Sequence, residues 1–363
     1  MKNNLLFGRK GSARAFQCIV FFAVLLIFPT GRLLAQSLDW VRQISNSGAE
    51  EIITTCRDRS NNFIVSGLFT GTTNFAAPGQ FPQYLSTTTG QYETFIAKYN
   101  SDGLLIWVKS IGGPNAQSIL INCLETRSDN SIVAGGSFSG LVDFDPGSGQ
   151  YQLNSYSLLF VDGFILQLDS NGAFVDVDGL GSQSLQASVV GFLKIDNQDN
   201  IIAVGSFQGT MDLDLSLATY TLTSGSDADM FVVKYSSNLS LNYCFKVGGQ
   251  FDQFPSTLSL DNNANIYLSF SYNSIIDVDP SSSIYLTSPT GDFSAGLVKY
   301  SSSGQFLSFS EFNGSDDVGI TDVHINNNRI LISGGFSGSF DLDPGLGNTI
   351  LTSGGSMDAF IGV

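Results

Sequence analysis

The chain contains a single histidine, His324, among 363 residues. Zinc sites are built mostly from cysteine and histidine, and the sequence has no Cys-x-x-Cys pair. A Ser-His-Asp triad would have to use His324, and no Gly-x-Ser-x-Gly motif accompanies it. The shortage of histidine excludes a Cys/His zinc site and argues against a serine hydrolase. We expect His324 to be a structural strand residue that matches Leu260 of another repeat.

Cysteine is also scarce, with four residues in the whole chain. Cys18 lies in an N-terminal apolar run. The other three, Cys56, Cys123 and Cys244, are odd in number and occupy no shared position in the repeats described below. We therefore expect small buried thiols and no disulfide framework.

Basic residues are few: 16 Lys and Arg stand against 32 Asp and Glu. Five of the basic residues and none of the acidic ones precede Gln36, so the remainder of the chain carries a net charge of −21. Such a chain repels nucleic acid and anionic lipid surfaces. The composition excludes these partners and favours a highly soluble protein.

Long apolar runs are absent except near the N-terminus. Four basic residues precede an apolar run from Phe16 to Phe28, and a polar break and Leu-Leu-Ala follow. This order is typical of a secretory signal peptide, and the run is short for the ~20 residues of a spanning helix. We predict a signal peptide at residues 1–35, with an uncleaved anchor as the alternative. The remainder, 36–363, is expected to be secreted or at the cell surface without membrane insertion.

What the sequence has in abundance is a repeat of 64 to 69 residues. The stretch FIAKYNSDG at Phe95 returns as FILQLDSNG at Phe164, FVVKYSSNL at Phe231, GLVKYSSSG at Gly296 and FIGV at Phe360. An earlier Gly-rich stretch returns as SGLFTG, GGSFSG, VGSFQG, LSFSYN and GGFSG, and an acidic stretch lies between the two. Three landmarks in one order, five times, define a structural repeat.

Each repeat has the pattern of four short strands. Alternating apolar residues, β-branched runs and Gly or Asn turns predict antiparallel strands, and FIAKY-type stretches predict half-buried ones. Such units bury their faces by stacking radially, so the predicted fold is an all-β propeller of about five four-stranded blades. The predicted units are approximately 46–110, 111–179, 180–247, 248–310 and 311–363, with an N-terminal strand at 37–45.

The repeat resembles the bacterial seven-bladed β-propeller repeat (SBBP). The matching motifs are DAFIGV, FVVKYSSN, KSIGG and KVGG, and the resemblance covers Ser37 to Val363. It departs from that pattern at Leu239, where the turn Gly is missing, and at Ser269–Phe270, where the strand Gly is missing. The resemblance implies a secreted propeller of Bacteroidota-like bacteria and implies no single activity.

The stretch SLDWVRQIS, at 37–45, matches the fourth strand of a unit, LLIWVKSIG. We expect it to pair with FIGV of the fifth unit and close the ring, because closure removes exposed sheet edges. A fragment of a longer protein with more blades is the alternative that the sequence leaves open.

The acidic stretch reads VDFDPG, MDLDL, IDVDP and FDLDPG in four of the units. Two carboxylates at the foot of a turn are ligands that Ca²⁺ prefers, although the stretch lacks the full EF-hand pattern. Pro and Gly after alternating residues equally predict a plain hairpin turn. The candidate Ca²⁺ ligands are Asp143, Asp145, Asp212, Asp214, Asp277, Asp279, Asp341 and Asp343.

No arrangement of residues has the pattern of a catalytic site. Glu125 and two other isolated glutamates are expected to be solvated, and Phe69, Phe138, Phe207 and Phe336 to be core rather than sugar-stacking residues. The sequence therefore predicts a non-enzymatic, monomeric recognition or scaffold module that binds a glycan or a protein, with no certain cofactor. The alternatives are a purely structural part of a larger surface protein and a secreted glycosidase, which a pair of non-repeated acids in a central cleft would favour.

Overall fold

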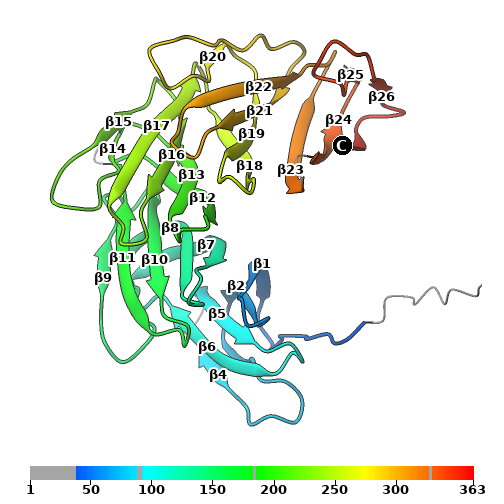
Figure 1. The fold of residues 1–363 in the computed structure, drawn as a ribbon. Coiled ribbons are helices and arrows are strands. Elements are labelled where there is room, and N and C mark those ends of the chain that lie inside the picture. Colours follow the sequence, from blue (N-terminus) through cyan, green and yellow to red (C-terminus); the bar gives the residue numbers. More distant parts are fainter. Residues whose placement is uncertain (1–37, 88–91, 183–184, 327–328) are drawn as a thin grey trace, which may run out of the picture. The chain divides into compact units, whose positions relative to one another are not determined.

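A computed structural model describes residues 38–87, 92–182, 185–326 and 329–363. The chain divides into two compact units, Met1–Asp39 and Trp40–Val363, and every described strand lies in the second unit. The predicted signal peptide lies outside the described residues. Every regular element of the described part is a strand, so the chain is all-β, as predicted (Figure 1).

In the described residues the strands form five larger antiparallel sheets and three two-stranded ones, and each larger sheet is built mainly from strands close together in the chain (Figure 1). The first sheet contains β1 (Glu50–Arg57), β2 (Phe63–Phe69), β5 (Glu93–Tyr99) and β6 (Leu105–Ile111). The second contains β7 (Ala116–Thr126), β8 (Ile132–Asp143), β10 (Asp162–Leu168) and β11 (Phe174–Leu180). The third contains β12 (Ser188–Ile195), β13 (Ile201–Phe207), β16 (Asp229–Tyr235) and β17 (Leu241–Gly249). The fourth contains β18 (Phe254–Leu260), β19 (Ile266–Tyr272), β21 (Ser294–Tyr300) and β22 (Phe306–Phe312), and the fifth β23 (Val318–Asn326), β24 (Arg329–Phe336) and β27 (Asp358–Gly362).

A short hairpin, which we call the acidic hairpin, stands between the second and third strands of each sheet. Its strands are β3 (Thr72–Asn74) and β4 (Tyr84–Ser86), the end of β8 with β9 (Gln152–Asn154), and β14 (Thr210–Asp212) and β15 (Thr221–Thr223). The last two hairpins contain β20 (Ile276–Asp277), and β25 (Ser339–Asp341) with β26 (Ile350–Thr352).

The core lies between successive sheets. One apolar cluster joins Ile64 and Ile96 of the first sheet to Ile121 and Leu166 of the second, and similar clusters join each later pair. The third strands of the first four sheets lie inside these clusters, and β10 and β16 are buried at every position, whereas β27 of the fifth sheet is mostly exposed. The prediction of half-buried third strands was therefore wrong for β5, β10, β16 and β21, which are almost fully buried, and in the second to fourth sheets the reason is that a neighbouring sheet packs on each face.

A glycine faces a phenylalanine across the second and third strands of every sheet. The pairs are Gly67–Phe95, Gly136–Phe164, Gly205–Phe231, Phe270–Gly296 and Gly334–Phe360. In the fourth sheet the two residues have exchanged strands, which accounts for the glycine that the sequence pattern lacks at Phe270. The ring covers its glycine partner, since a Cβ on Gly205 would lie 2.7 Å from the Phe231 ring.

The predicted N-terminal strand at 37–45 is not formed within its described part. Residues 38–46 contain no strand, and β27 pairs only with β24. Instead, the Trp40 indole donates to Ser101 O at 2.9 Å and the Arg42 guanidinium to Gly103 O at 2.6 Å. Both acceptors belong to the turn between β5 and β6, so the polar anchors of this segment lie on the first sheet rather than the fifth.

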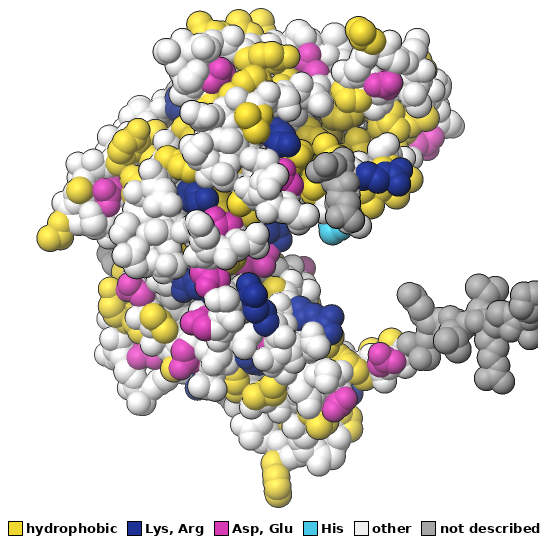
Figure 2. All heavy atoms as spheres, in the orientation of Figure 1, with side chains coloured by type: hydrophobic (Ala, Val, Ile, Leu, Met, Phe, Trp, Pro, Cys, Tyr) yellow, Lys and Arg dark blue, Asp and Glu magenta, His cyan; other side chains and the backbone are white. Residues whose placement is uncertain are grey.

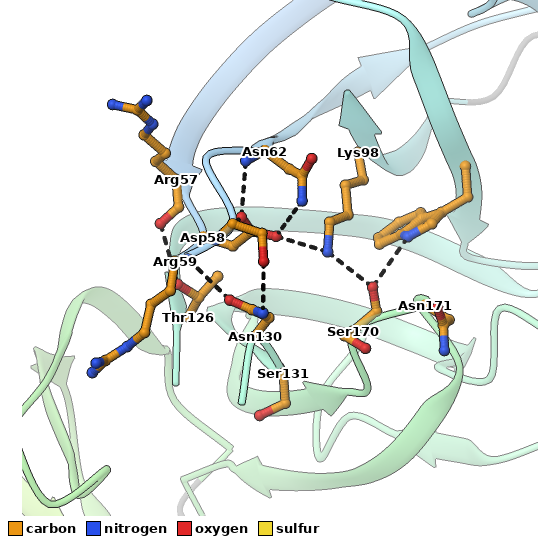
Figure 3. Close-up of polar contacts among 12 residues, drawn as sticks. Arg57, Asp58, Arg59, Asn62, Lys98, Thr126, Asn130, Ser131, Ser170 and Asn171 are labelled. Carbon is orange, nitrogen blue, oxygen red and sulfur yellow. Dashed lines mark hydrogen bonds and ion pairs between the residues drawn. The ribbon is translucent and has the colours of Figure 1, made fainter. Parts of the chain in front are cut away.

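The lysine of a buried ion pair in the first sheet also donates a hydrogen bond to the second sheet (Figure 3). Asp58, in the turn after β1, lies 2.9 Å from Lys98 Nζ on β5, and both side chains are almost fully buried. The same ammonium donates to Ser170 O of the second sheet at 3.0 Å, and Trp107 Nε1 donates to that carbonyl at 3.3 Å. Lys234 repeats the arrangement with Asp196 and Ser302 O, so a charged anchor recurs where sheets meet.

Candidate functional site: the inner cavity

The first strand of each sheet carries a β-bulge at the same place. The register shifts lie between Ile52 and Thr54, Ile121 and Cys123, Val190 and Phe192, Pro255 and Thr257, and Ile320 and Asp322. A bulge re-aims the side chains that follow it, and bulges are frequent beside functional sites. The residues that follow the five bulges line one cavity.

This inner cavity has a volume of about 320 Å³, which is in the lower range for a small-ligand site. All five first strands contribute to it. Its lining is Thr54, Thr55, Asn122, Cys123, Leu124, Glu125, Phe192, Leu193, Lys194, Thr257, Leu258, Ser259, Asp322, Val323 and His324. The cavity therefore combines hydroxyl, amide and charged groups with an aromatic ring and aliphatic side chains.

The lining residues differ at two of their three equivalent levels. The strand registers place Thr54, Cys123, Phe192, Thr257 and Asp322 at one level, and Cys56, Glu125, Lys194, Ser259 and His324 two residues further on. Within either of these two rows only Thr54 and Thr257 are identical, and every residue except Cys56 lines the cavity. The row between them is mostly leucine and consists of Thr55, Leu124, Leu193, Leu258 and Val323. Elsewhere the repeat keeps its residues, as in the Gly–Phe pairs. This local variety is the signal that could have located the site from sequence.

The register also corrects the expected position of His324. His324 lies opposite Leu331 and Ser259 opposite Tyr267, so His324 matches Ser259 and not Leu260. A shift of one residue moves a side chain to the other face of a strand. His324 is exposed and lines the inner cavity, where the sequence predicted a purely structural residue.

Side chains connect neighbouring first strands around the cavity. Lys194 forms an ion pair with Glu125 of the preceding sheet, which corrects the expectation that Glu125 is an isolated, solvated residue. The Asn122 amide donates to Val190 O at 3.0 Å, and the Ser259 hydroxyl donates to Val323 O. Cys123 is buried, and burial raises the pKa of its thiol, so it contributes a neutral group to the wall.

A second cavity of about 350 Å³ adjoins the first, and Lys194, Ser259 and His324 line both. It lies among the turns that connect first and second strands, and it includes Asp196 and Asp261. Both carboxylates are engaged, Asp196 with Lys234 at 2.9 Å and Asp261 with Lys299 at 3.6 Å. We call this second cavity the mouth of the inner cavity.

The predicted Ca²⁺ ligands lie elsewhere, in the acidic hairpins. The first aspartate of each pair accepts backbone N–H bonds that close the hairpin loop: Asp143 Oδ1 accepts from Asp145 N at 3.1 Å and Tyr151 N at 2.9 Å. The same two bonds are made by Asp212, Asp277 and Asp341, and by Asn74 in the first hairpin. An asparagine in the same role shows that the loop needs an oxygen acceptor there, and that a charge is not required.

The hairpins also join sheets. Asp143 N donates to Gly112 O of the first sheet at 2.8 Å, and Ser182, Gly248 and Gly314 form equivalent bridges to the next three hairpins. The eight predicted ligands are spread over four hairpins. Among the described residues, three carboxylates approach within 4.8 Å of one another only at Asp292, Asp316 and Asp317, which do not belong to the predicted set.

We expect Asp143→Asn to leave the thermal midpoint within about 2 °C, because Asn accepts the same two N–H bonds, and Asp143→Ala to lower it clearly. Losing both bonds should cost roughly 1–3 kcal/mol, since two backbone donors lose their partner. Differential scanning calorimetry in Ca²⁺ and in EDTA checks this. A midpoint that rises in Ca²⁺ for the native chain and not for Asp143→Asn would identify a metal site instead.

The remaining sequence predictions concern buried residues. Phe69, Phe138 and Phe207 are at most 2 % exposed and Phe336 3 %, which confirms that they belong to the core. Cys56, Cys123 and Cys244 are free thiols. Cys123 and Cys244 are buried as predicted, whereas Cys56 is only partly buried.

The chain matches no known family model and no curated protein. Within the part of the chain that the structure describes, no helix has the length and apolar character to cross a membrane.

Proposed function

We propose that this chain is an exported, non-catalytic recognition or scaffold module at the cell surface, and that it binds its ligand, a glycan or a protein segment, in the inner cavity. The observation that carries the proposal is the contrast between repeated and varied positions. The hairpins, the Gly–Phe pairs and the Asp–Lys anchors recur because each sheet must be built in the same way. Two of the three rows of cavity residues vary from sheet to sheet, as a single asymmetric ligand requires, while the row between them is mostly leucine.

The composition of the cavity favours a polyhydroxylated ligand. The Thr54 and Thr55 hydroxyls supply donors and acceptors, and leucine side chains together with the partly buried Phe192, which also packs on the core, supply an apolar wall. Small-molecule sites typically combine an apolar wall with a few placed polar groups. A glycan end or a polar loop of a protein has this chemistry.

A glycan array probed with residues 36–363 tests the proposal. We expect a restricted set of glycans to bind, and Thr55→Trp to abolish that binding, because the exposed Thr55 lines the cavity and an indole there would fill it. Ser216→Trp, in an exposed hairpin loop, is the matched control and should leave binding unchanged. Binding that survives Thr55→Trp would show that the ligand binds outside the inner cavity.

Within the all-β class, we propose that the fold is a β-propeller of about five blades, related to the SBBP repeat and closed by the segment at 37–45. The contacts of Trp40 support this. Its indole donates to Ser101 O as Trp107 of β6 donates to Ser170 O, the equivalent carbonyl of the next sheet. Trp40 also lies against Gly103 as Trp107 lies against Gly172. The segment therefore contacts the first sheet as a fourth strand contacts the sheet that follows it.

The fifth sheet has a place for such a strand. A mostly apolar groove of about 410 Å³, lined by Phe312, Ile332, Leu342 and Val363 among others, lies beside β27, and Figure 2 shows hydrophobic side chains at the surface around β23 and β24. Val41 is 70 % exposed, whereas its equivalent in β6, Val108, packs against the core. Pairing of the segment at 37–45 with β27 would cover both the groove and the Val41 side chain.

A disulfide test follows from the register of β5 and β6, in which Lys109 faces Ile96. The equivalent pair is Arg42 and Ile361. We expect Arg42→Cys with Ile361→Cys to form an intramolecular disulfide under mild oxidation, seen as a faster monomer on a non-reducing gel. The pair Gln43→Cys with Ile361→Cys is offset by one residue and should form no disulfide. A cross-linked dimer, or no cross-link, would contradict closure within one chain.

A glycosidase is the second candidate, and one observation favours it. Glu125 and Asp322, two acids outside the repeated motif, line the same cavity. Paired carboxylates perform glycoside hydrolysis, although the ion pair with Lys194 occupies Glu125 here. Release of new reducing ends from an array-positive glycan, lost in both Glu125→Gln and Asp322→Asn, would establish this activity. No release under the same conditions supports the non-catalytic role.

A further inference from the structure

Within the described part of the chain, one carboxylate of the inner cavity differs from its neighbours in having no partner. Glu125 and Lys194 neutralise each other, and at the mouth Asp196 and Asp261 are paired with lysines. Asp322 is exposed to the cavity, and among the described residues no hydrogen bond or ion pair engages its carboxylate. Asp322 is therefore the one carboxylate among the described cavity-lining residues without an ion-pair partner.

We propose that the inner cavity selects a sugar that carries a free, non-acetylated amine, and that Asp322 receives the ammonium group. This inference rests on the proposed recognition function and specifies its ligand. An ammonium beside Asp322 forms a charge-assisted hydrogen bond, which is about twice as strong as a neutral one. A ligand that carries a carboxylate would be repelled by Asp322. Lys194 would not offset this repulsion, because Glu125 already forms an ion pair with it.

The surroundings of Asp322 suit an amino sugar. The bulge after Ile320 places Asp322 at the same strand level as Thr257 and Phe192. Thr257 is buried and Phe192 packs partly on the core. The hydroxyls of Thr54 and Thr55 in the same cavity are therefore the groups that can serve sugar hydroxyls. A cavity of about 320 Å³ accommodates one sugar ring, so the selected unit is a single terminal or internal residue of a longer glycan.

The position is specific to the fifth sheet. The other four sheets hold Thr54, Cys123, Phe192 and Thr257 at this level, and none of these carries a charge. The hairpin aspartates, in contrast, recur and close loops with their own carboxylate oxygens. Asp322 is thus the acid of this cavity that no structural contact explains.

Isothermal titration with a glucosamine oligomer and its fully N-acetylated counterpart tests the proposal on residues 36–363. We expect the free-amine oligomer to bind at least tenfold more tightly, and Asp322→Asn to remove this preference. Asp102→Asn, in the exposed turn after β5, is the matched control and should retain it. The thermal midpoint of each variant verifies folding.

The outcomes separate this inference from the function on which it rests. Equal binding of the two oligomers in the native chain, with both lost in Thr55→Trp, would overturn the amine preference and keep the inner cavity as a glycan site. A preference that persists in Asp322→Asn would overturn the role of Asp322. Binding of neither oligomer would overturn the amino-sugar inference, and the array result would then decide on the proposed function.

Discussion

Gly205→Ala should destabilise the protein by more than about 4 kcal/mol, or prevent its folding, because a Cβ at this position has no space. The added Cβ would lie 1.9 Å from Val189 O, a backbone atom of β12, and 2.7 Å from the ring of Phe231. Neither neighbour is the free end of a flexible side chain. The substitution would force β12 away from β13 at the bulge that aims the third sheet's side chains into the inner cavity.

Urea unfolding followed by tryptophan fluorescence measures this loss. Gly355→Ala is the matched control, since no atom lies within 4 Å of the added Cβ, and its free energy of unfolding should change by less than about 0.5 kcal/mol. If Gly205→Ala were as mild as the control, the repeated glycine would not be required by the packing of strand on strand.

Asp58→Ala should cost about 3–5 kcal/mol, because it leaves the ammonium of Lys98 buried without its carboxylate. Asp58 also accepts backbone N–H bonds from Ser60 at 2.9 Å and from Asn62 at 2.8 Å, so the turn after β1 loses its internal support (Figure 3). Since Lys98 also holds Ser170 O, the damage should extend to the contact between first and second sheets.

The loss should depend on pH. Burial by itself raises the pKa of Asp58, but hydrogen bonds from Asn62 and Lys98 outweigh burial and hold the pKa below its ordinary value. The carboxylate therefore stabilises the fold above the unfolded-state pKa, and this contribution disappears as the pH falls through the lowered folded-state pKa. Chemical unfolding should show a large difference in the free energy of unfolding between Asp58→Ala and the native chain at pH 7. Near pH 3 this difference should be smaller. Asp102→Ala, an exposed aspartate, should differ little from it at either pH.

The sequence was sufficient for the all-β class and for antiparallel units, because strand periodicity and turn residues are local properties. It was insufficient for burial of the third strands. FIAKY and FVVKY have the pattern of strands with one polar face, yet Lys98 and Lys234 lie inside and are neutralised by Asp58 and Asp196. That pairing depends on a turn some 40 residues earlier, which no local pattern indicates.

The candidate site was missed for a related reason. The sequence drew attention to what repeats, and the acidic hairpins repeat because each loop needs an acceptor for two N–H groups. The cavity residues are isolated in sequence and come together only when five first strands meet. His324 also required the correct register, since a shift of one residue separates a core position from a cavity position.

In the function that we propose, the varied residues of the inner cavity contact the ligand, and the repeated acidic hairpins do not. Hydrogen–deuterium exchange with and without a saturating array-positive glycan distinguishes the two surfaces. We expect slower exchange in the first strands, at 54–55, 122–125, 192–194, 257–259 and 322–324. Slower exchange confined to the hairpins at 143–151, 212–220, 277–285 and 341–349 would contradict the proposal.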